Sequence, residues 1–427
     1  MKRRGGLELM AVFMCFGLAL SMVGSSPAQA QEYNLGVVLG LTGSGSSYSA
    51  DAVKGITLAV EEINTKGGFL GKHQIKLKVR DDQTKPETGV RETKDLILRE
   101  KVRSIIGPWS SAVALGMEEI CYENKVLHFM IISNSEAMTT QNYSPYTFNT
   151  MCNTYMNSKA QVLYLKKQAQ VKNWEKYVTI VSDYEWGHAM QSNFVAQAKG
   201  SVPEMKLVKE YWPRLGETDF TSYITAILRD APDFVYGNIA DKDHMSFLKQ
   251  AKPYGLFNKS AYTSLVSVTE LKVLAKEIPR GLIGTSRCAF FFHMDNPLMQ
   301  TFVKNYLQKY GEHPSDWSVG GYDAVYIVKQ GIEKGSTIES EKVKNAMRGM
   351  TVETTRGKLY FRSIDNQING PSYFGVVKDD PAYPFPIYGE RVLIPGEECW
   401  RPVKEIVEIR KKTGLDKKRS PEDIPNE

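Results

Sequence analysis

Short apolar runs alternate along the chain with longer segments in which apolar residues recur every three or four positions. Residues 33–41 form the first apolar run and lead into a loop of small residues, which predicts a strand followed by a turn. The segment from Val53 to Ile63 carries its apolar residues on one face of a helix. It ends at Gly67-Gly68, which tolerate the left-handed conformation of a helix end. The first unit is therefore expected to be a strand, a turn and an amphipathic helix.

This alternation comes in two series, separated near residue 153. In the first series we expect strands at 33–41, 75–79, 102–106 and 126–132. In the second we expect strands at 177–181, 207–211, 234–236, 261–265 and 282–285. Strands that alternate with helices predict parallel sheets with both faces covered, and 427 residues exceed the usual size of one core. The sequence therefore predicts an α/β protein with two doubly wound, Rossmann-like lobes.

The first thirty residues have the three parts of a secretory signal peptide. Basic residues at 2–4 precede an apolar stretch at 9–23, and Ala28-Gln29-Ala30 forms a small-residue cleavage site. The apolar stretch has about 15 residues, whereas a membrane-spanning helix needs about 20. We therefore expect cleavage after Ala30 and a mature protein in the periplasm.

Composition and motifs argue against several classes of function. The formal net charge is +6, of which residues 1–30 hold +2, and the remaining +4 is too small to indicate nucleic-acid binding. The histidines form no close ligand pair, so no metal site or cofactor is expected. A GxSxG nucleophile elbow and a P-loop are both missing. We do not expect an enzyme, and no residue is proposed as catalytic.

Two further features of the composition concern the folded chain. Four cysteines follow the leader, and export permits either disulfides, with three full pairings, or isolated buried thiols; they are Cys121, Cys152, Cys288 and Cys399. The densest basic cluster, 410–419, lies near the C-terminus. It is expected to be a solvated tail.

Small polar residues follow the strands of the first series. Ligands of doubly wound sheets bind outside the carboxyl ends of the strands. Trp109, Ser110 and Ser111 follow the third expected strand, and Ser133 and Ser135 follow the fourth. A helix that begins there would offer free N–H groups and a positive dipole end to a carboxylate. The alternative is that these serines only cap their own helices.

Aromatic and polar residues follow the strands of the second series. Tyr184 and Trp186 come after the strand at 177–181, where their rings could cover the apolar part of a ligand or pack on their own helix. Ala240 and Asp241 lie in the loop after the strand at 234–236 and are directed to the same cleft. Both sets support one binding site between the two lobes.

The chain resembles the periplasmic solute-binding proteins of branched-chain amino acid ABC transporters, the receptor family A type. The resemblance extends from about residue 33 to about residue 377. Its motifs are each modest, and their order and spacing make the match specific. They are Leu41-Thr42-Gly43, residues 55–64 and 67–71, Asp81-Asp82, residues 106–111, Thr218-Asp219-Phe220, residues 232–236 and Gly321-Tyr322-Asp323-Ala324.

The resemblance implies a type I periplasmic binding fold with a three-crossing hinge. The crossings would lie near Cys152, Ser286 and Gly375, which places Cys152 and Cys288 on neighbouring hinge strands as one disulfide option. Residues 31–151 and 286–374 would form the first lobe. Residues 152–285 and 375–427, including the C-terminal tail, would form the second.

It also implies a ligand site between the lobes. The carboxylate of the ligand would be held by Ser111 and by groups around Ser135 and Ala137, and Trp186 would cover it. Together with the residues after the strands, the expected site comprises Tyr48, Trp109, Ser110, Ser111, Ser133, Ser135, Ala137, Tyr184, Trp186, Ala240, Asp241 and Leu265.

One departure from the family pattern concerns the ligand's ammonium group. Amino-acid binders place an acid after the strand at 261–265, but here the first acid is Glu270. A buried ammonium without a counter-charge is costly. Either Asp241 or Asp183 takes that role, or the ligand is an aromatic or aliphatic carboxylate without an amino group.

These features together predict a monomeric, non-enzymatic substrate-binding component of an ABC importer. Its partners would be a small carboxylate ligand, such as an amino acid, and the permease subunits of the inner membrane, with no nucleic acid. The alternative is a sensor of the same fold that passes ligand binding to a signalling partner. In either case binding would proceed by closure of two lobes about a hinge.

Overall fold

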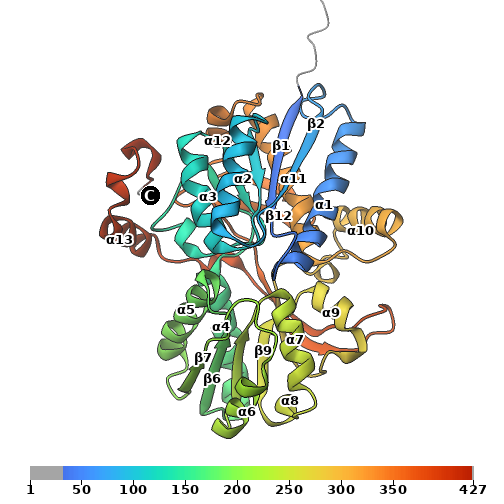
Figure 1. Ribbon diagram of the computed structural model, residues 1–427, viewed down its shortest axis with the longest axis vertical. Helices are drawn as coiled ribbons and strands as arrows, with labels where there is room; N and C mark the ends of the chain where they lie inside the picture. Colours follow the sequence, from blue (N-terminus) through green and yellow to red (C-terminus); the bar gives the residue numbers. More distant parts are fainter. Residues whose placement is uncertain (1–31, 426–427) are drawn as a thin grey trace, which may run out of the picture.

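The computed structural model describes residues 32–425 and forms two α/β lobes stacked along the long axis of the molecule (Figure 1). The expected fold class is confirmed: each lobe has a central, largely parallel sheet with helices on its faces. The predicted leader, residues 1–30, lies outside the described residues. Among the residues described, no helix is long and apolar enough to cross a membrane.

The first lobe is built on an eight-stranded sheet with the order β11-β12-β13-β5-β4-β3-β1-β2. Its strands are β1 (Tyr33–Leu39), β2 (Ile75–Asp81), β3 (Ser104–Ile106), β4 (Leu127–Met130), β5 (Thr147–Asn149), β11 (Thr351–Thr354), β12 (Gly357–Arg362) and β13 (Gln367–Ile368). Strands β1 to β5 run parallel, β13 pairs in parallel with β5, and β12 and β11 extend the edge with antiparallel pairing. Its helices are α1 (Ser46–Thr65), α2 (Pro86–Leu98), α3 (Ser111–Glu123), α10 (Pro297–Tyr310), α11 (Asp316–Gly335) and α12 (Ser340–Met347).

Helices α1 and α11 pack closely because α1 carries a glycine at their contact. A Cβ atom on Gly55 would lie 2.0 Å from the carbonyl oxygen of Ser318 in α11. On the same helix Ile56, Ala59 and Ile63 are buried, at the helical spacing that the sequence shows. This packing positions the N-terminal ends of both helices next to the second lobe.

The second lobe is built on a seven-stranded sheet with the order β15-β14-β10-β9-β8-β6-β7. Its strands are β6 (Lys176–Val181), β7 (Lys206–Tyr211), β8 (Phe234–Asn238), β9 (Ala261–Leu265), β10 (Ile283–Ser286), β14 (Ser372–Lys378) and β15 (Ile387–Ile394). Strands β14 and β15 are antiparallel to their neighbours, and the others are parallel. Its helices are α4 (Thr154–Lys172), α5 (Glu185–Ser201), α6 (Thr221–Asp230), α7 (Asp241–Ala251), α8 (Leu256–Lys259) and α9 (Val268–Leu274).

The chain crosses between the lobes three times, as expected, and once more, but the third crossing lies at residues 369–371, before Gly375, near which it was expected. The expected crossings join β5 to α4, β10 to α10, and β13 to β14. After β15 the chain returns to the first lobe, where α13 (Val403–Thr413) lies at its edge and the residues after α13 contact α3 (Figure 1). The prediction that the whole C-terminal tail belongs to the second lobe is therefore wrong beyond β15.

Buried arginines hold this C-terminal segment to the first lobe. The guanidinium of Arg410 donates to the carbonyl oxygens of Thr139 and Ile364 at 3.1 and 2.8 Å. Arg419 donates to Glu119 in α3, with Nη2 and Oε2 2.7 Å apart. The expected solvated tail is thus a docked segment, because carbonyls and an acid far away in the sequence bind its two arginines, while the four lysines of the cluster stay exposed.

The four cysteines Cys121, Cys152, Cys288 and Cys399 are buried free thiols. The structure therefore has isolated thiols, and Cys152 and Cys288 do not form a disulfide. The thiol of Cys288 donates to the carbonyl oxygen of Asp316 at 2.8 Å, which ties the β10 crossing to the start of α11.

Candidate functional site

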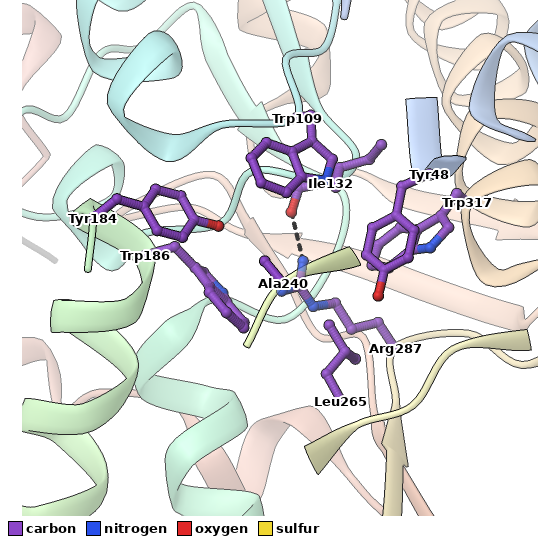
Figure 2. Close-up of a pocket in the computed structure, with 9 residues that line it drawn as sticks. All are labelled: Tyr48, Trp109, Ile132, Tyr184, Trp186, Ala240, Leu265, Arg287 and Trp317. Atoms are coloured by element: carbon purple, nitrogen blue, oxygen red, sulfur yellow. Dashed lines mark hydrogen bonds between the residues drawn. The ribbon is translucent and has the colours of Figure 1, made fainter. Parts of the chain in front are cut away.

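A small cavity lies between the two lobes at the carboxyl ends of their strands. Its walls come from both lobes, as Figure 2 shows. The first lobe contributes Tyr48, Trp109, Ile132 and Trp317, and the second contributes Tyr184, Trp186, Ala240, Leu265 and, on the crossing after β10, Arg287.

Aromatic rings make up five of the nine lining residues. The rings of Trp109 and Tyr184 face each other across the lobes with centroids 5.8 Å apart and planes 2° from parallel. On the opposite side Tyr48 stacks on Trp317 with centroids 4.3 Å apart. The indole N–H of Trp186 is buried and has no acceptor among the described residues. The walls therefore offer flat apolar faces and one unused hydrogen-bond donor.

Arg287 is the charged residue in the cavity lining. Its side chain is directed into the centre of the aromatic residues, and Nη1 donates to the carbonyl oxygen of Ile132 at 2.5 Å (Figure 2). Nε is buried without an acceptor among the described residues. Burial lowers the pKa of the guanidinium from its ordinary value. The cavity therefore has positive charge and, in the part of the chain that the structure describes, no carboxylate in its wall.

Several hydrogen bonds join the lobes beside the cavity. The backbone N–H of Tyr48 donates to Oδ2 of Asp241 at 3.1 Å, and its hydroxyl donates to Glu270. The hydroxyl of Thr269 donates to Asp51 at 2.7 Å. Burial raises the pKa of Asp241 well above its ordinary value, and the nearby charge of Glu270 adds to this effect. These contacts cross from α1 to α7 and α9, so the lobes are closed upon each other.

The two acids proposed as ammonium partners do not line the cavity. Asp241 directs Oδ2 to the N–H of Tyr48, although Oδ1 is buried without a partner among the described residues. Asp183 lies 2.8 Å from His188, where both side chains are exposed to solvent. The cavity wall itself therefore offers an ammonium group no counter-charge within residues 32–425.

The structure brings half of the predicted site residues together. Tyr48, Trp109, Tyr184, Trp186, Ala240 and Leu265 line the cavity, whereas Ser110, Ser111, Ser133, Ser135, Ala137 and Asp241 do not. Ser111 Oγ accepts from the N–H groups of Asn134 and Ser135 at 3.3 and 3.2 Å. Ser135 and Ala137 line a separate space at the rim between the lobes, where Ser135 donates to Glu185 at 2.6 Å.

Sequence reasoning missed Ile132, Arg287 and Trp317. Arg287 stands alone as a charge between Gly281 and Phe292 in a stretch of small and apolar residues. A lone cation in such a stretch, near an expected crossing, was an available signal. Trp317 has no such signal, because an aromatic residue near a helix start is an ordinary core residue.

The sequence matches a known protein family over most of its length. Residues 32–382 match the family model described as "Periplasmic binding protein". The chain is 23% identical over 381 residues to "Leu/Ile/Val-binding protein homolog 7" of Brucella abortus (strain 2308), covering 86% of this chain and 94% of that protein.

Two solved structures extend the comparison to the fold. A leucine-binding protein from Thermotoga maritima has a TM-score of 0.74 at 20% identity, covering 86% of this chain and 99% of that one. A solute-binding protein of an ABC transporter from Rhodopseudomonas palustris HaA2, in complex with p-hydroxybenzoic acid, has a TM-score of 0.75 at 21% identity and covers 86% and 98%. At these identities the likeness concerns the fold.

Proposed function

Because the chain belongs to the family of periplasmic binding proteins, we propose that it is the substrate-binding component of an ABC importer and captures a small carboxylate between its lobes. The observation that carries this proposal is the cavity whose wall is divided between the two lobes. A ligand that contacts both lobes stabilises their closed arrangement relative to the open one. The transporter can then distinguish loaded from empty carrier by shape.

The lining favours an aromatic carboxylate over an amino acid. Five aromatic rings supply flat faces for a planar ligand, and Arg287 supplies a cation. An amino acid would bring an ammonium group into a wall that contains no acid among the described residues. The p-hydroxybenzoic acid bound by the Rhodopseudomonas protein is a ligand of this chemistry in the same fold.

The proposed cycle makes and breaks no bond in the protein. Ligand enters the open cleft, the lobes close about the crossings, and closure excludes water from the guanidinium and the rings. Permease subunits in the membrane then receive the ligand. We further propose export to the periplasm with cleavage after Ala30, which the mass of the protein recovered from a periplasmic extract would test.

A thermal-shift screen tests the function. The panel pairs benzoate, 4-hydroxybenzoate and phenylacetate with leucine, valine and phenylalanine. A ligand at 100 times its dissociation constant is expected to add about 2.7 kcal/mol of stability, so binding is visible as a raised melting temperature. We expect the aromatic acids to raise it more than the amino acids do.

The opposite ranking would contradict the proposed ligand class, and no shift with any acid would contradict carboxylate capture. A matched control is Trp212→Ala, because Trp212 is an aromatic residue of the second lobe outside the cavity wall. It should leave the ranking of ligands unchanged.

A further inference from the structure

We propose that Arg287 makes closure depend on charge: its guanidinium binds the carboxylate of the ligand, and without an anion its burial opposes closure. This proposal rests on the proposed function and adds to it the residue that selects the ligand and couples it to the hinge. It follows from three observations: how the arginine is buried, where it lies on the chain, and which atoms surround it.

Among the described residues, the other buried arginines have more polar partners than Arg287, although Nε of Arg410 also lacks an acceptor. Arg356 is 4% exposed and donates from Nε to Asp323 at 2.9 Å. Arg410, 3% exposed, donates to three backbone carbonyl oxygens, and Arg419 pairs with Glu119. Arg287, also 3% exposed, has one hydrogen bond to a carbonyl oxygen and no ion pair with any described residue. A buried cation in this state is costly unless an anion joins it.

The position of Arg287 makes this cost a property of the closed form. It follows β10 directly, on a crossing between the lobes. Its Nη1 bonds to Ile132 and its guanidinium carbon lies 5.5 Å from the ring centre of Trp317, both in the first lobe. Trp186 and Leu265 in the cavity wall belong to the second lobe. Separating the lobes would remove that wall and let water solvate the guanidinium.

The neighbours of Arg287 are donors and neutral groups, so the ligand must bring the acceptors. The indole N–H of Trp186 is a second donor without an acceptor in the described chain. The titratable groups nearest the guanidinium are Cys152, Cys288, Tyr48 and Tyr184, which are neutral at pH 7. A carboxylate satisfies such a set, whereas a primary amide of the same shape adds donors and carries no charge.

The test compares each acid with its own amide in wild-type protein and in Arg287→Met, which keeps an unbranched apolar side chain and removes the charge. In wild type, benzoate should bind at least about 30-fold more tightly than benzamide, as for loss of one partner of a desolvated charged pair. In Arg287→Met, benzoate affinity should fall by at least the same factor, and benzamide should bind more tightly than benzoate. Titration calorimetry measures all four affinities, with 4-hydroxybenzoate and its amide as a second pair.

Ligand-free protein tests the coupling to closure separately. Without ligand, Arg287→Met should have a smaller radius of gyration by small-angle X-ray scattering than wild type, because its closed form no longer buries an unpaired cation. The matched control is Arg391→Met, since Arg391 donates to the carbonyl of Phe291 at 2.7 Å and lies outside the cavity wall. It should match wild type in scattering and in the preference for acids.

Each outcome has a definite meaning. Equal binding of acid and amide by wild type, or undiminished benzoate binding by Arg287→Met, overturns the role of the guanidinium. A loss of benzoate binding with unchanged ligand-free scattering overturns the coupling to closure. If wild type binds no acid at all, the proposed function fails, and the scattering comparison still decides whether Arg287 opposes closure.

Discussion

Replacing Asp323 with alanine is expected to lower the free energy of unfolding by about 3–5 kcal/mol, as when one partner of a buried ion pair is removed. Asp323 is 1% exposed in α11 and accepts from Nε of Arg356 at 2.9 Å. It also accepts from the N–H and the hydroxyl of Thr355, each at 2.9 Å. Alanine would leave the guanidinium buried beside the crossings with Thr150 as its remaining oxygen partner.

Urea unfolding followed by circular dichroism measures this effect. The matched control is Glu353→Ala, which removes an acid of the neighbouring strand β11 whose partner, Lys358, is 3.5 Å away and exposed. Exposed pairs contribute little, so this variant should unfold near wild type. If Asp323→Ala also lowered the free energy of unfolding only slightly, the buried ion pair with Arg356 would not have the expected effect on stability. The double replacement Asp323→Leu with Arg356→Met should recover part of the loss, because no charge then remains buried.

The two lobes could be predicted because their strands are local patterns. The strand expected at 177–181 is β6 (Lys176–Val181), and the one expected at 261–265 is β9 (Ala261–Leu265). Strands β5 and β15 were missed for different reasons. β5 has three residues and forms by pairing with β4 and β13, whereas β15 lies in a segment that was assigned to the second lobe without a predicted strand. Its pairing with β14 depends on where the third crossing places the chain.

The C-terminal helix illustrates a limit of reasoning from charge patterns. A cluster of Lys and Arg is usually solvated, and nothing nearby in the sequence neutralises it. Arg410 is satisfied by Thr139 and Ile364, and Arg419 by Glu119. These partners are separated from the two arginines by tens to hundreds of residues, so only the folded chain reveals that the C-terminal segment is docked.

Some residues of the candidate site could be predicted from the sequence and others could not. Trp109, Tyr184 and Trp186 could be predicted because the carboxyl ends of parallel strands form the ligand-binding edge. Arg287 and Trp317 could not be placed by that rule, since one lies on a crossing and the other at the start of α11. The prediction that the ligand could lack an ammonium group came from the missing acid after the strand at 261–265. The guanidinium of Arg287 in the cavity wall supports that prediction, because it would repel an ammonium group.

Ligand affinity is expected to rise as pH falls from 8 to 5, with a slope of at most tenfold per pH unit for each proton taken up. Closure buries Asp241 between α1 and α7, and burial raises the pKa of its carboxyl well above the ordinary value. The N–H of Tyr48, the hydroxyl of Ser47 and the charge of Lys242 oppose the shift, and Glu270 adds to it. With the lobes apart, water would return the pKa towards its ordinary value.

The sign follows from these two states. A carboxyl group whose pKa is higher in the closed form takes up a proton on closing. Closure is therefore favoured at low pH, and this advantage disappears as pH rises through the closed-state pKa of Asp241. Burial also raises the pKa of Asp316, which accepts from the N–H of Val268 at 2.8 Å and adds to the same trend. Above pH 5 a carboxylate ligand stays largely ionised, so the ligand itself does not reverse the sign.

Calorimetric titration with the tightest acid at several pH values, in buffers of different ionisation enthalpy, measures both affinity and proton uptake. Asp241→Asn keeps an acceptor for the N–H of Tyr48 and cannot take up the proton, so its slope should be smaller than that of wild type. The control Asp183→Asn changes an exposed acid away from the contact between the lobes and should keep the wild-type slope. A slope that is unchanged in Asp241→Asn, or an affinity that rises with pH, would show that the buried carboxyl of Asp241 does not oppose closure at neutral pH.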